Sequence, residues 1–462
     1  MRLEFPRLRK FLILLCFLLP ASLTWLSCGA ATPASTQTTG LKYRAFLSNN
    51  VSAGTSAAGI YIVDAQNDIK PAASPITAGN TPGMMVVTPN RAQTLVFSGT
   101  GTLSSDNQLS MINNASESTA AHVTLPGMTE SFVVSPDSST AYVAVPTAPV
   151  IGQSPGVMEV VALSGTVTGQ AEVPAIHYLS INNGGSRVLG FSDNSDSIAV
   201  ITPSNIGIPG AVVVTYVPGF DRPVAAFFSS DDTTAWVINC GAECGGTHAG
   251  VQQIDLTNNT LGPSVGACSQ DPNGQCAGTV AFLNGTTLYL AGTPYAGGVP
   301  SQPCTGQTTA ATTCGVLNII DLGSMSPVNA EPIIITDGYH NRIAMGDNGQ
   351  LFIGARNCTE IIPPVPPPTG AEVRGCLSIY NTLGKAVGSV PGGGVLIPSA
   401  NGDATGIQPI ATRQVVYVVQ GGSLAIYDAT IDALYYNQHD PNNPGQIFGL
   451  IGNFIDVKTV DF

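Results

Sequence analysis

One phrase recurs along the chain, and this repeat constrains the fold more than any other feature. The clearest copy, residues 130–146, reads as an alternating strand, a Ser135-Pro136-Asp137 turn and a second strand rich in β-branched and aromatic residues. Weaker copies occupy residues 83–97, 178–191, 224–238, 279–290, 341–353 and 406–419. A strand–turn–strand phrase that recurs along a whole chain predicts a repeat architecture in which each copy belongs to one supersecondary unit.

Each unit is expected to contain four strands. The phrase supplies the first two, a third apolar strand ends near Asp or Asn, and a weaker outer strand follows. Third strands are expected at residues 60–64, 109–113, 251–255, 317–321, 377–381 and 424–428, and outer strands most clearly at 122–125, 211–217 and 332–336. Four-stranded units of roughly 40 to 50 residues are typical of propeller blades. The predicted fold class is therefore all-β, a β-propeller.

The two ends of the repeat region predict how the ring closes. The first unit starts with a strand of the second type, residues 43–47, and has no inner strand before it. The last unit is expected to end with an outer strand at 447–451, and the tail 454–462 has the pattern of an inner strand. The C-terminal strand should therefore complete the first blade and leave no unpaired edge. This count predicts eight four-stranded blades, with seven as the alternative if one weak unit is not a blade.

The clearest copy resembles a known family. The turn at residues 135–137, followed by Ala141-Tyr142-Val143-Ala144, is similar to the YVTN family of β-propeller repeats of bacterial surface and periplasmic proteins. The resemblance covers nearly all of residues 41–462, although some copies replace the Pro-Asp turn, as at 182–185. It implies a single propeller domain over 41–462. It also implies a scaffold, an adhesion module, a lactonase or a quinoprotein-like enzyme, and it does not choose among them.

The first 40 residues predict export. Residues 1–27 combine a basic start with an apolar run at 11–19 that is too short to span a bilayer comfortably, as in a signal peptide. The order before Cys28 resembles a bacterial lipobox and predicts a lipid on Cys28; cleavage after Ala30 or Ala31 is the alternative. Residues 28–40 read as a flexible tether. The expected location is the cell envelope, as a membrane-anchored lipoprotein on the periplasmic or surface side.

The net charge of the chain limits the classes of partner that it is expected to bind. The chain carries a formal net charge of −13 with only 16 Lys and Arg. A surface so poor in cations argues against nucleic acid and against contact with anionic lipid other than through the lipid anchor. The expected partners are a protein, a glycan or a small anionic ligand, and the chain is expected to be a monomer.

Eight cysteines after the tether fall into close pairs. An even count in an exported chain predicts disulfides, and the clustering favours neighbouring partners. The predicted pairs are Cys240 with Cys244, Cys268 with Cys276, Cys304 with Cys314, and Cys358 with Cys376. Metal binding is the alternative for the first pair, but no zinc-type His–Cys pattern accompanies it.

The cysteine pairs lie in connections that leave one face of a propeller. Three pairs fall between second and third strands, and one falls between an outer and the next inner strand. The longest insertions lie in the same kinds of connection, at residues 147–155, 239–250, 292–315 and 357–375. Loops on one face of a rigid scaffold often carry function. The alternative is that the disulfides only stiffen long loops.

Polar residues at the starts of the inner strands are the site candidates, because these starts point to the channel on the same face. The predicted ligand-binding residues are Glu130, His177, Arg222, Tyr339, His340, Asn341, Arg342 and Arg356. Guanidinium forks match a carboxylate or phosphate. A purely structural role is the alternative for such residues. The run 193–196 has oxygen ligands of the calcium type but reads better as a polar turn.

The sequence shows no nucleophile elbow, phosphate loop, HExxH or kinase motif. No catalytic residue, cofactor or metal site is therefore predicted, and the five His argue against a multi-copper or zinc enzyme. The favoured function is a cell-envelope binding or scaffold propeller that displays its stapled face to a ligand or partner. The alternative is an exported enzyme, lactonase-like or quinoprotein-like, that acts at the mouth of the channel.

Overall fold

In the computed structural model, every described strand belongs to one compact unit, residues 39–462. The structure describes residues 38–51, 57–99, 106–267, 276–294, 314–329, 331–358, 375–388, 390–398, 402–435, 445–447 and 449–461. The predicted signal peptide and Cys28 lie outside these residues, so the lipid anchor stays a prediction. No helix in the described ranges is long and apolar enough to cross a membrane.

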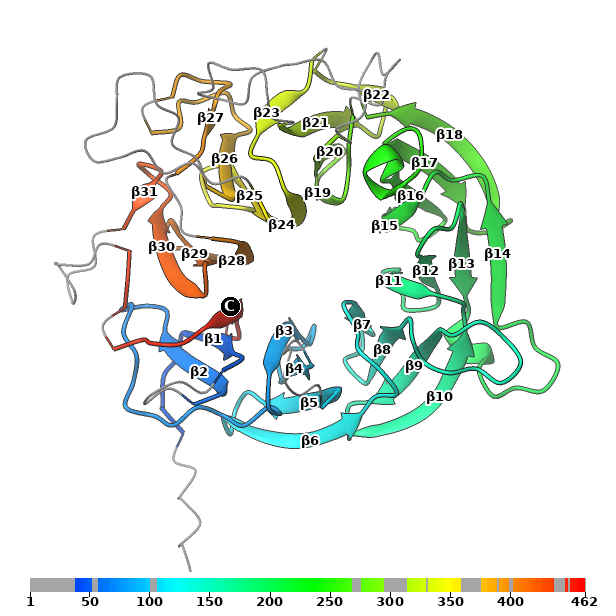
Figure 1. Cartoon of the computed structure of the whole chain (residues 1–462), viewed down its shortest axis with the longest axis horizontal. Coiled ribbons are helices and arrows are strands. Elements are labelled where there is room, and N and C mark those ends of the chain that lie inside the picture. The colour runs from blue at the N-terminus through cyan, green and yellow to red at the C-terminus, as the bar shows by residue number, and fades with distance from the viewer. Residues whose placement is uncertain are drawn as a thin grey trace, which may run out of the picture. The chain divides into compact units, whose positions relative to one another are not determined.

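Eight antiparallel sheets form a ring, which confirms the predicted eight blades (Figure 1). Blade 1 contains β1 (Arg44–Asn49), β2 (Gly59–Asp64) and β32 (Phe454–Thr459). Blade 2 contains β3 (Pro82–Val87), β4 (Gln93–Ser98), β5 (Gln108–Asn113) and β6 (Ser118–Thr124). Blade 3 contains β7 (Phe132–Val134), β8 (Thr140–Val145), β9 (Val157–Ala162) and β10 (Thr166–Glu172). Blade 4 contains β11 (Ile176–Ile181), β12 (Val188–Ser192), β13 (Ser197–Ile201) and β14 (Val214–Pro218).

The second half of the ring repeats this order. Blade 5 contains β15 (Pro223–Phe228), β16 (Thr234–Asn239), β17 (Gly250–Asp255) and β18 (Thr260–Gly266). Blade 6 contains β19 (Val280–Asn284), β20 (Thr287–Gly292), β21 (Gly315–Asp321), β22 (Ser326–Pro327) and β23 (Ile333–Ile335). Blade 7 contains β24 (Tyr339–Met345), β25 (Gln350–Arg356), β26 (Leu377–Asn381) and β27 (Val395–Leu396). Blade 8 contains β28 (Ala404–Ile410), β29 (Val415–Gln420), β30 (Ser423–Asp428) and β31 (Ala433–Leu434). Two short 3-10 helices, Pro203–Asn205 and Gly241–Cys244, lie in connections.

The ring closes as predicted. β32 pairs antiparallel with β1, with Ala45 opposite Thr459, so the last strand of the chain is the inner strand of the first blade. The outer position of this blade is held by two bridges, from Ile60 to Ile76 and from Asp64 to Ile69. The outer strand expected at 447–451 is wrong, because the described residues there form no strand. The two-residue β31 pairs with β30 instead.

The repeated phrase owes its shape to its turn. The Ser135 hydroxyl accepts hydrogen bonds from the backbone of Ser139 and Thr140 and donates to the Asp137 carboxylate. The residue after Asp137 is in the left-handed conformation, with φ of 59° at Ser138. The fourth turn residue of other copies is also left-handed, at Arg91, Gly185 and Asp232. The copy at 182–185 therefore differs in sequence but has the same turn geometry, because glycine adopts the left-handed conformation at low cost.

The core is distributed between the blades. The described apolar residues form eight clusters, and each lies between two neighbouring blades. Neighbouring residues of one strand enter different clusters: Leu351 and Ile353 pack toward blade 6, and Phe352 packs toward blade 8. Central strands are therefore buried on both faces and read as continuous apolar runs.

Side chains also link successive inner strands. The backbone N–H of Leu179 donates to the Ser131 hydroxyl, and that of Ala226 donates to the Ser180 hydroxyl, each at 3.0 Å. The N–H of Met85 donates to the Asp456 carboxylate at 3.0 Å. These bonds satisfy backbone donors at the channel edge, where no further strand follows.

Two of the predicted disulfides are present. Cys240 is bonded to Cys244 and Cys358 to Cys376, with S–S distances of 1.94 and 1.99 Å. Cys276 and Cys314 are also disulfide-bonded. Their predicted partners, Cys268 and Cys304, lie outside the described residues. The strand order confirms that the pairs fall in connections that leave one face, which we call the stapled face.

Candidate functional site

Irregular pairing at the starts of the inner strands shapes the stapled face. The register between first and second strands shifts at His177 in blade 4, Val224 in blade 5, Asn341 in blade 7 and Thr405 in blade 8. A similar shift precedes Met85 in blade 2. A bulge leaves its extra residue unpaired and changes the direction of the side chain. The repeated bulge therefore brings side chains to the channel mouth that a regular strand would not.

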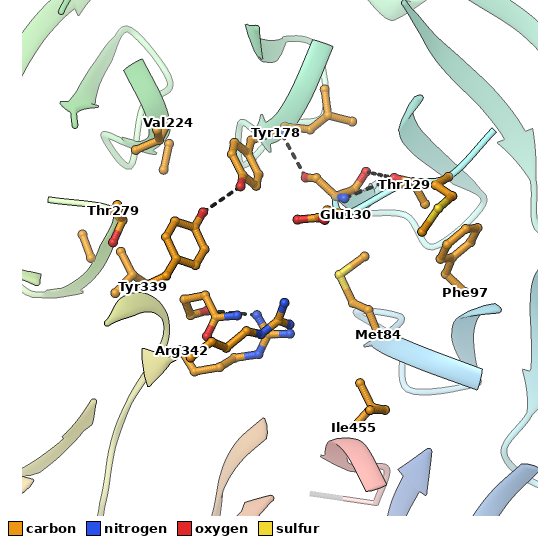
Figure 2. Close-up of a pocket in the computed structure, with 18 residues that line it drawn as sticks. Met84, Phe97, Thr129, Glu130, Tyr178, Val224, Thr279, Tyr339, Arg342 and Ile455 are labelled. Carbon is orange, nitrogen blue, oxygen red and sulfur yellow. Dashed lines mark hydrogen bonds between the residues drawn. The ribbon is translucent and has the colours of Figure 1, made fainter. Parts of the chain in front are cut away.

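A cavity of about 320 Å³, the central cavity, lies at this mouth (Figure 2). One side of its wall is apolar and includes Met84, Phe97 and Ile455, as Figure 2 shows. The remaining wall mixes apolar residues such as Val224 with polar ones. The polar lining includes Glu130, Tyr339, Asn341, Arg342 and Arg356. An apolar cavity with a few convergent polar groups is typical of a small-molecule site.

Two arginines dominate the polar side. Arg342 donates from Nε to the carbonyl of Thr405 at 2.8 Å and from Nη1 to its neighbour's carbonyl at 2.9 Å. The Nε of Arg356 and the Oδ1 of Asn341 are buried without a hydrogen-bond partner. Among the described residues, neither arginine forms an ion pair with a carboxylate. Both charges instead act on Glu130 and help to lower its pKa.

His177 lies between two carboxylates at the rim. Its Nδ1 is 2.8 Å from Asp193 Oδ1, its Nε2 is 3.4 Å from Glu130 Oε2, and its ring stacks on Tyr178. Burial opposes protonation, but the hydrogen bonds and charges of the two carboxylates outweigh it and raise the pKa of His177. The hydrogen bond from His177 is in turn the main cause that lowers the pKa of Glu130. A protonated imidazole that donates to both carboxylates fits this geometry.

A second cavity of about 310 Å³, the side cavity, adjoins the first. His177, Asp193, Asn194 and Arg222 are among the residues that line it. Both cavities are lined by Tyr178, Val224 and Tyr339, which form a shared wall. The two phenol oxygens are 2.8 Å apart, and Figure 2 shows this hydrogen bond across the space between β11 and β24.

The structure divides the predicted site residues into three groups. Glu130, Tyr339, Asn341, Arg342 and Arg356 line the central cavity. His177 and Arg222 line the side cavity, where Arg222 Nη1 is 3.5 Å from Asp196 and its Nε is buried without a partner. His340 lines neither cavity. It is fully buried, and burial lowers the pKa of its ring to about 4.

Sequence reasoning missed several residues of this face. Tyr178 was not among the candidates, and Asp193 was considered only as part of a calcium-type run and interpreted as a turn residue, although it directly follows a second strand, as Arg356 ends one. Glu243, in the loop closed by Cys240 and Cys244, was also missed. It accepts the backbone N–H of Thr293 at 2.9 Å, and burial raises its pKa to about 8. Position at the end of a second strand was the available signal for Asp193; nothing in the sequence marked Glu243.

Within the described ranges, no group of three or more His, Cys, Asp or Glu is placed to hold a metal ion.

The fold and this site define a β-propeller with a ligand-sized cavity at the mouth of its channel. No protein-family model matches the chain, and no curated protein matches it. Its similarity to the YVTN repeats therefore stays a prediction from the turn and strand motif.

Solved structures resemble the chain in fold. Hydrazine synthase of Kuenenia stuttgartiensis is 13% identical, covers 78% of this chain and 99% of its own, and has a TM-score of 0.50. The dihydro-heme d1 dehydrogenase NirN, in complex with DHE, is 13% identical, with coverage of 91% and 76% and a TM-score of 0.55. The Dos1 propeller is 9% identical, with coverage of 82% and 84% and a TM-score of 0.51. Similarity at identities this low shows a shared fold only, so function has to be argued from the residues of the site.

Proposed function

We propose that this chain is an exported binding propeller of the cell envelope that holds a ligand with a carboxylate or phosphate group at its channel mouth. The observation that carries the proposal is that Arg342 and Arg356 line one cavity and form no ion pair with a described carboxylate, although Glu130 lines the same cavity. The positive charges stand out against a net charge of −13. Local positive potential in a cavity concentrates small anions.

The energetics favour an anion over water alone. A buried polar atom without a partner costs roughly 1–3 kcal/mol, and Arg356 Nε and Asn341 Oδ1 are both in this state. An anionic oxygen placed between the guanidinium groups would accept charge-assisted hydrogen bonds, the stronger kind. A ligand hydroxyl or N–H beside it would satisfy Asn341.

The cysteines support the location. Disulfides persist in oxidising compartments, and four described cysteines are in two such bonds. We place the protein in the envelope, tethered through a lipid on Cys28, with the stapled face presented to its ligand.

The test is a ligand screen by thermal shift and calorimetry with a panel of carboxylates and phosphates. The double variant Arg342→Ala and Arg356→Ala should lose every anion response of the wild type. Arg187→Ala is the matched control, because Arg187 lies in a turn on the opposite face and its guanidinium bonds only the carbonyl of Ser186 among the described residues. An unchanged response of the double variant, or no anion hit at all, would contradict the proposal.

Catalysis is the second candidate, and one observation favours it. His177, held between Glu130 and Asp193 at the rim, is an oriented imidazole whose raised pKa favours the protonated form, so it could act as a proton donor. A lactonase-like or quinoprotein-like activity would require turnover that His177→Gln abolishes. Assays of lactone hydrolysis and of cofactor absorbance on purified protein distinguish this candidate from simple binding.

A further inference from the structure

The two cavities are neighbours with different chemistry. The central cavity has the two arginines and a large apolar wall. The side cavity mixes acceptors with a donor: the Asp193 carboxylate, the Asn194 amide and the guanidinium of Arg222. A single carboxylate or phosphate would occupy the central cavity and would give the side cavity no role. Each cavity alone is at the lower limit for a ligand site of a few hundred Å³, whereas the two together lie well within that range.

We propose that the two cavities are subsites of one groove, and that its ligand is a short acidic saccharide. The carboxylate of a uronate ring would lie on Arg342 and Arg356, and a neutral sugar ring would lie in the side cavity. This inference rests on the proposed function, since it names the ligand class of the same site.

Hydroxyl chemistry fits the side cavity. A sugar hydroxyl both donates and accepts, so neighbouring hydroxyls can donate to Asp193 and accept from Arg222 at the same time. The buried Nε of Arg222 lacks a partner that such an oxygen would supply. A second anion in the side cavity would meet the half-exposed carboxylate of Asp193 with Arg222 as the one arginine of the lining, whereas two arginines offset Glu130 in the central cavity.

The shared wall fits a ring-shaped ligand. Tyr339 is 38% exposed and, with Tyr178, offers flat carbon surface beside two hydrogen-bonded phenol oxygens. An aromatic side chain presents an apolar face and a polar tip. A sugar pair that crosses this wall would place its apolar C–H surface on the ring and its linking oxygen near the phenols.

A peptide fits the same groove less well. Extended peptides bind by adding a strand to a free sheet edge. Here the inner strands are already engaged, because the N–H groups of Met85, Leu179 and Ala226 donate to side chains of the preceding blade. A long polyanion is also disfavoured, since the overall charge of −13 repels it.

The experiment measures calorimetric affinity for four probes. They are glucuronate, a panel of aldobiouronates that join one uronate to one neutral hexose, the matching neutral disaccharides, and an acidic tripeptide. The variants are Arg222→Met in the side cavity, the double variant Arg342→Ala and Arg356→Ala, and the control Arg187→Met. Methionine keeps the apolar stem of arginine and removes its donors.

The expected result is that at least one aldobiouronate binds the wild type about tenfold or more tighter than glucuronate, while neutral disaccharides do not bind. Arg222→Met should reduce that aldobiouronate to the affinity of glucuronate and leave glucuronate itself unchanged. Arg187→Met should behave as the wild type.

Two other outcomes separate this inference from the proposed function. Equal affinity for glucuronate and every aldobiouronate, no effect of Arg222→Met, or tighter binding of the tripeptide overturns the saccharide groove but keeps the anion site. Failure of every carboxylate and phosphate to bind overturns both.

Discussion

Arginines on the two faces of the ring are in opposite states. On the face with short turns, Arg44 makes a two-pronged ion pair with Asp461, at 2.6 and 2.8 Å, and a third bond to Glu117 at 2.9 Å. Arg413 joins blade 8 to blade 1 through Asp68, with two bonds of 2.7 Å. On the stapled face, Arg342 and Arg356 form no ion pair with a described carboxylate, and the Nε of Arg356 is buried without a partner. Arg222 has only a 3.5 Å contact with Asp196.

We infer from this difference that Arg44 and Arg413 stabilise the fold, whereas the arginines of the stapled face are available for binding. The Arg44 and Arg413 networks satisfy their donors with groups of neighbouring blades, and both carboxylates Glu117 and Asp68 are nearly fully buried. Their partners come from the same chain, so the network is complete on folding. A charge that folding leaves unpaired costs free energy unless something else pairs it. We propose that the arginines at the cavity, which pair with no described carboxylate, bind a ligand, whereas the paired arginines Arg44 and Arg413 hold neighbouring blades together.

The largest expected effect is loss of the closing strand. Deletion of residues 454–462 removes β32, the fully buried side chains of Phe454 and Val457, and the partner of β1. We expect a loss of more than about 5 kcal/mol in unfolding free energy, because truncation of one buried Phe to Ala alone costs roughly 3–5 kcal/mol. Thermal unfolding followed by circular dichroism measures it. Ile451→Ser, at an exposed position just before the strand, is the control; an unchanged melting temperature of the deletion would refute closure by this strand.

The second largest effect is expected from loss of the ion pair between Arg413 and Asp68, which joins blade 8 to blade 1. Arg413→Ala leaves the Asp68 carboxylate, whose side chain is 2% exposed, without its charge partner. Breaking a buried pair from one side costs roughly 3–5 kcal/mol. The double variant Arg413→Met and Asp68→Asn should recover part of this loss, which chemical denaturation in a double-mutant cycle would show. Additive single effects would mean that the pair is not coupled.

The mouth arginines should behave differently. Arg342→Ala with Arg356→Ala should cost less unfolding free energy than Arg413→Ala, on the order of 1–2 kcal/mol in the absence of ligand, because the variant loses the two hydrogen bonds from Arg342 to carbonyls but no ion pair among the described residues. The same melting and denaturation measurements check it. A loss as large as that of Arg413→Ala would erase the contrast between the two faces and make the mouth arginines structural.

Burial of Glu243 in the stapled face should make the stability of the chain depend on pH. Its pKa is about 8 in the folded chain, against an ordinary value of 4.5, so the folded state keeps a proton that the unfolded state has released. Stability should therefore fall as pH rises from about 4.5 to 8 and then level off. Glu243→Gln should remove this slope and stabilise the chain on the order of 2 kcal/mol at pH 8.5, with no gain at pH 4. Equal pH profiles of melting temperature would contradict the raised pKa.

The smallest effect is expected from the titration of the His177 ring. Nuclear magnetic resonance should find the pKa of its ring above the ordinary 6.5, and Glu130→Gln or Asp193→Asn should each lower it. The stability it contributes is complete below the ordinary pKa and is lost as pH rises through the raised value. His122, which is not in this site, serves as an internal reference. A His177 pKa that neither substitution moves would mean that the carboxylates do not hold its proton.

The sequence alone determined the architecture because the repeat is local and redundant. Turn chemistry at residues such as Ser135 and Asp137, and apolar runs that enter two clusters at once, predict a blade without any knowledge of its neighbours. The spare strand at 454–459 predicted closure because an open edge is costly. Clustering of the cysteines along the chain likewise predicted pairs that the structure bears out at 240–244 and 358–376.

Only the tertiary structure decided the site. Glu130, His177 and Arg356 belong to three different blades, and their distances depend on bulges and on the angle between blades, which no local pattern encodes. His340 and Asn341 illustrate the limit: they are adjacent in sequence, yet one is fully buried and its neighbour lines the cavity, because a bulge shifts the register between them. Local sequence specifies which residues stand at the strand starts, and long-range packing selects which of them face the channel.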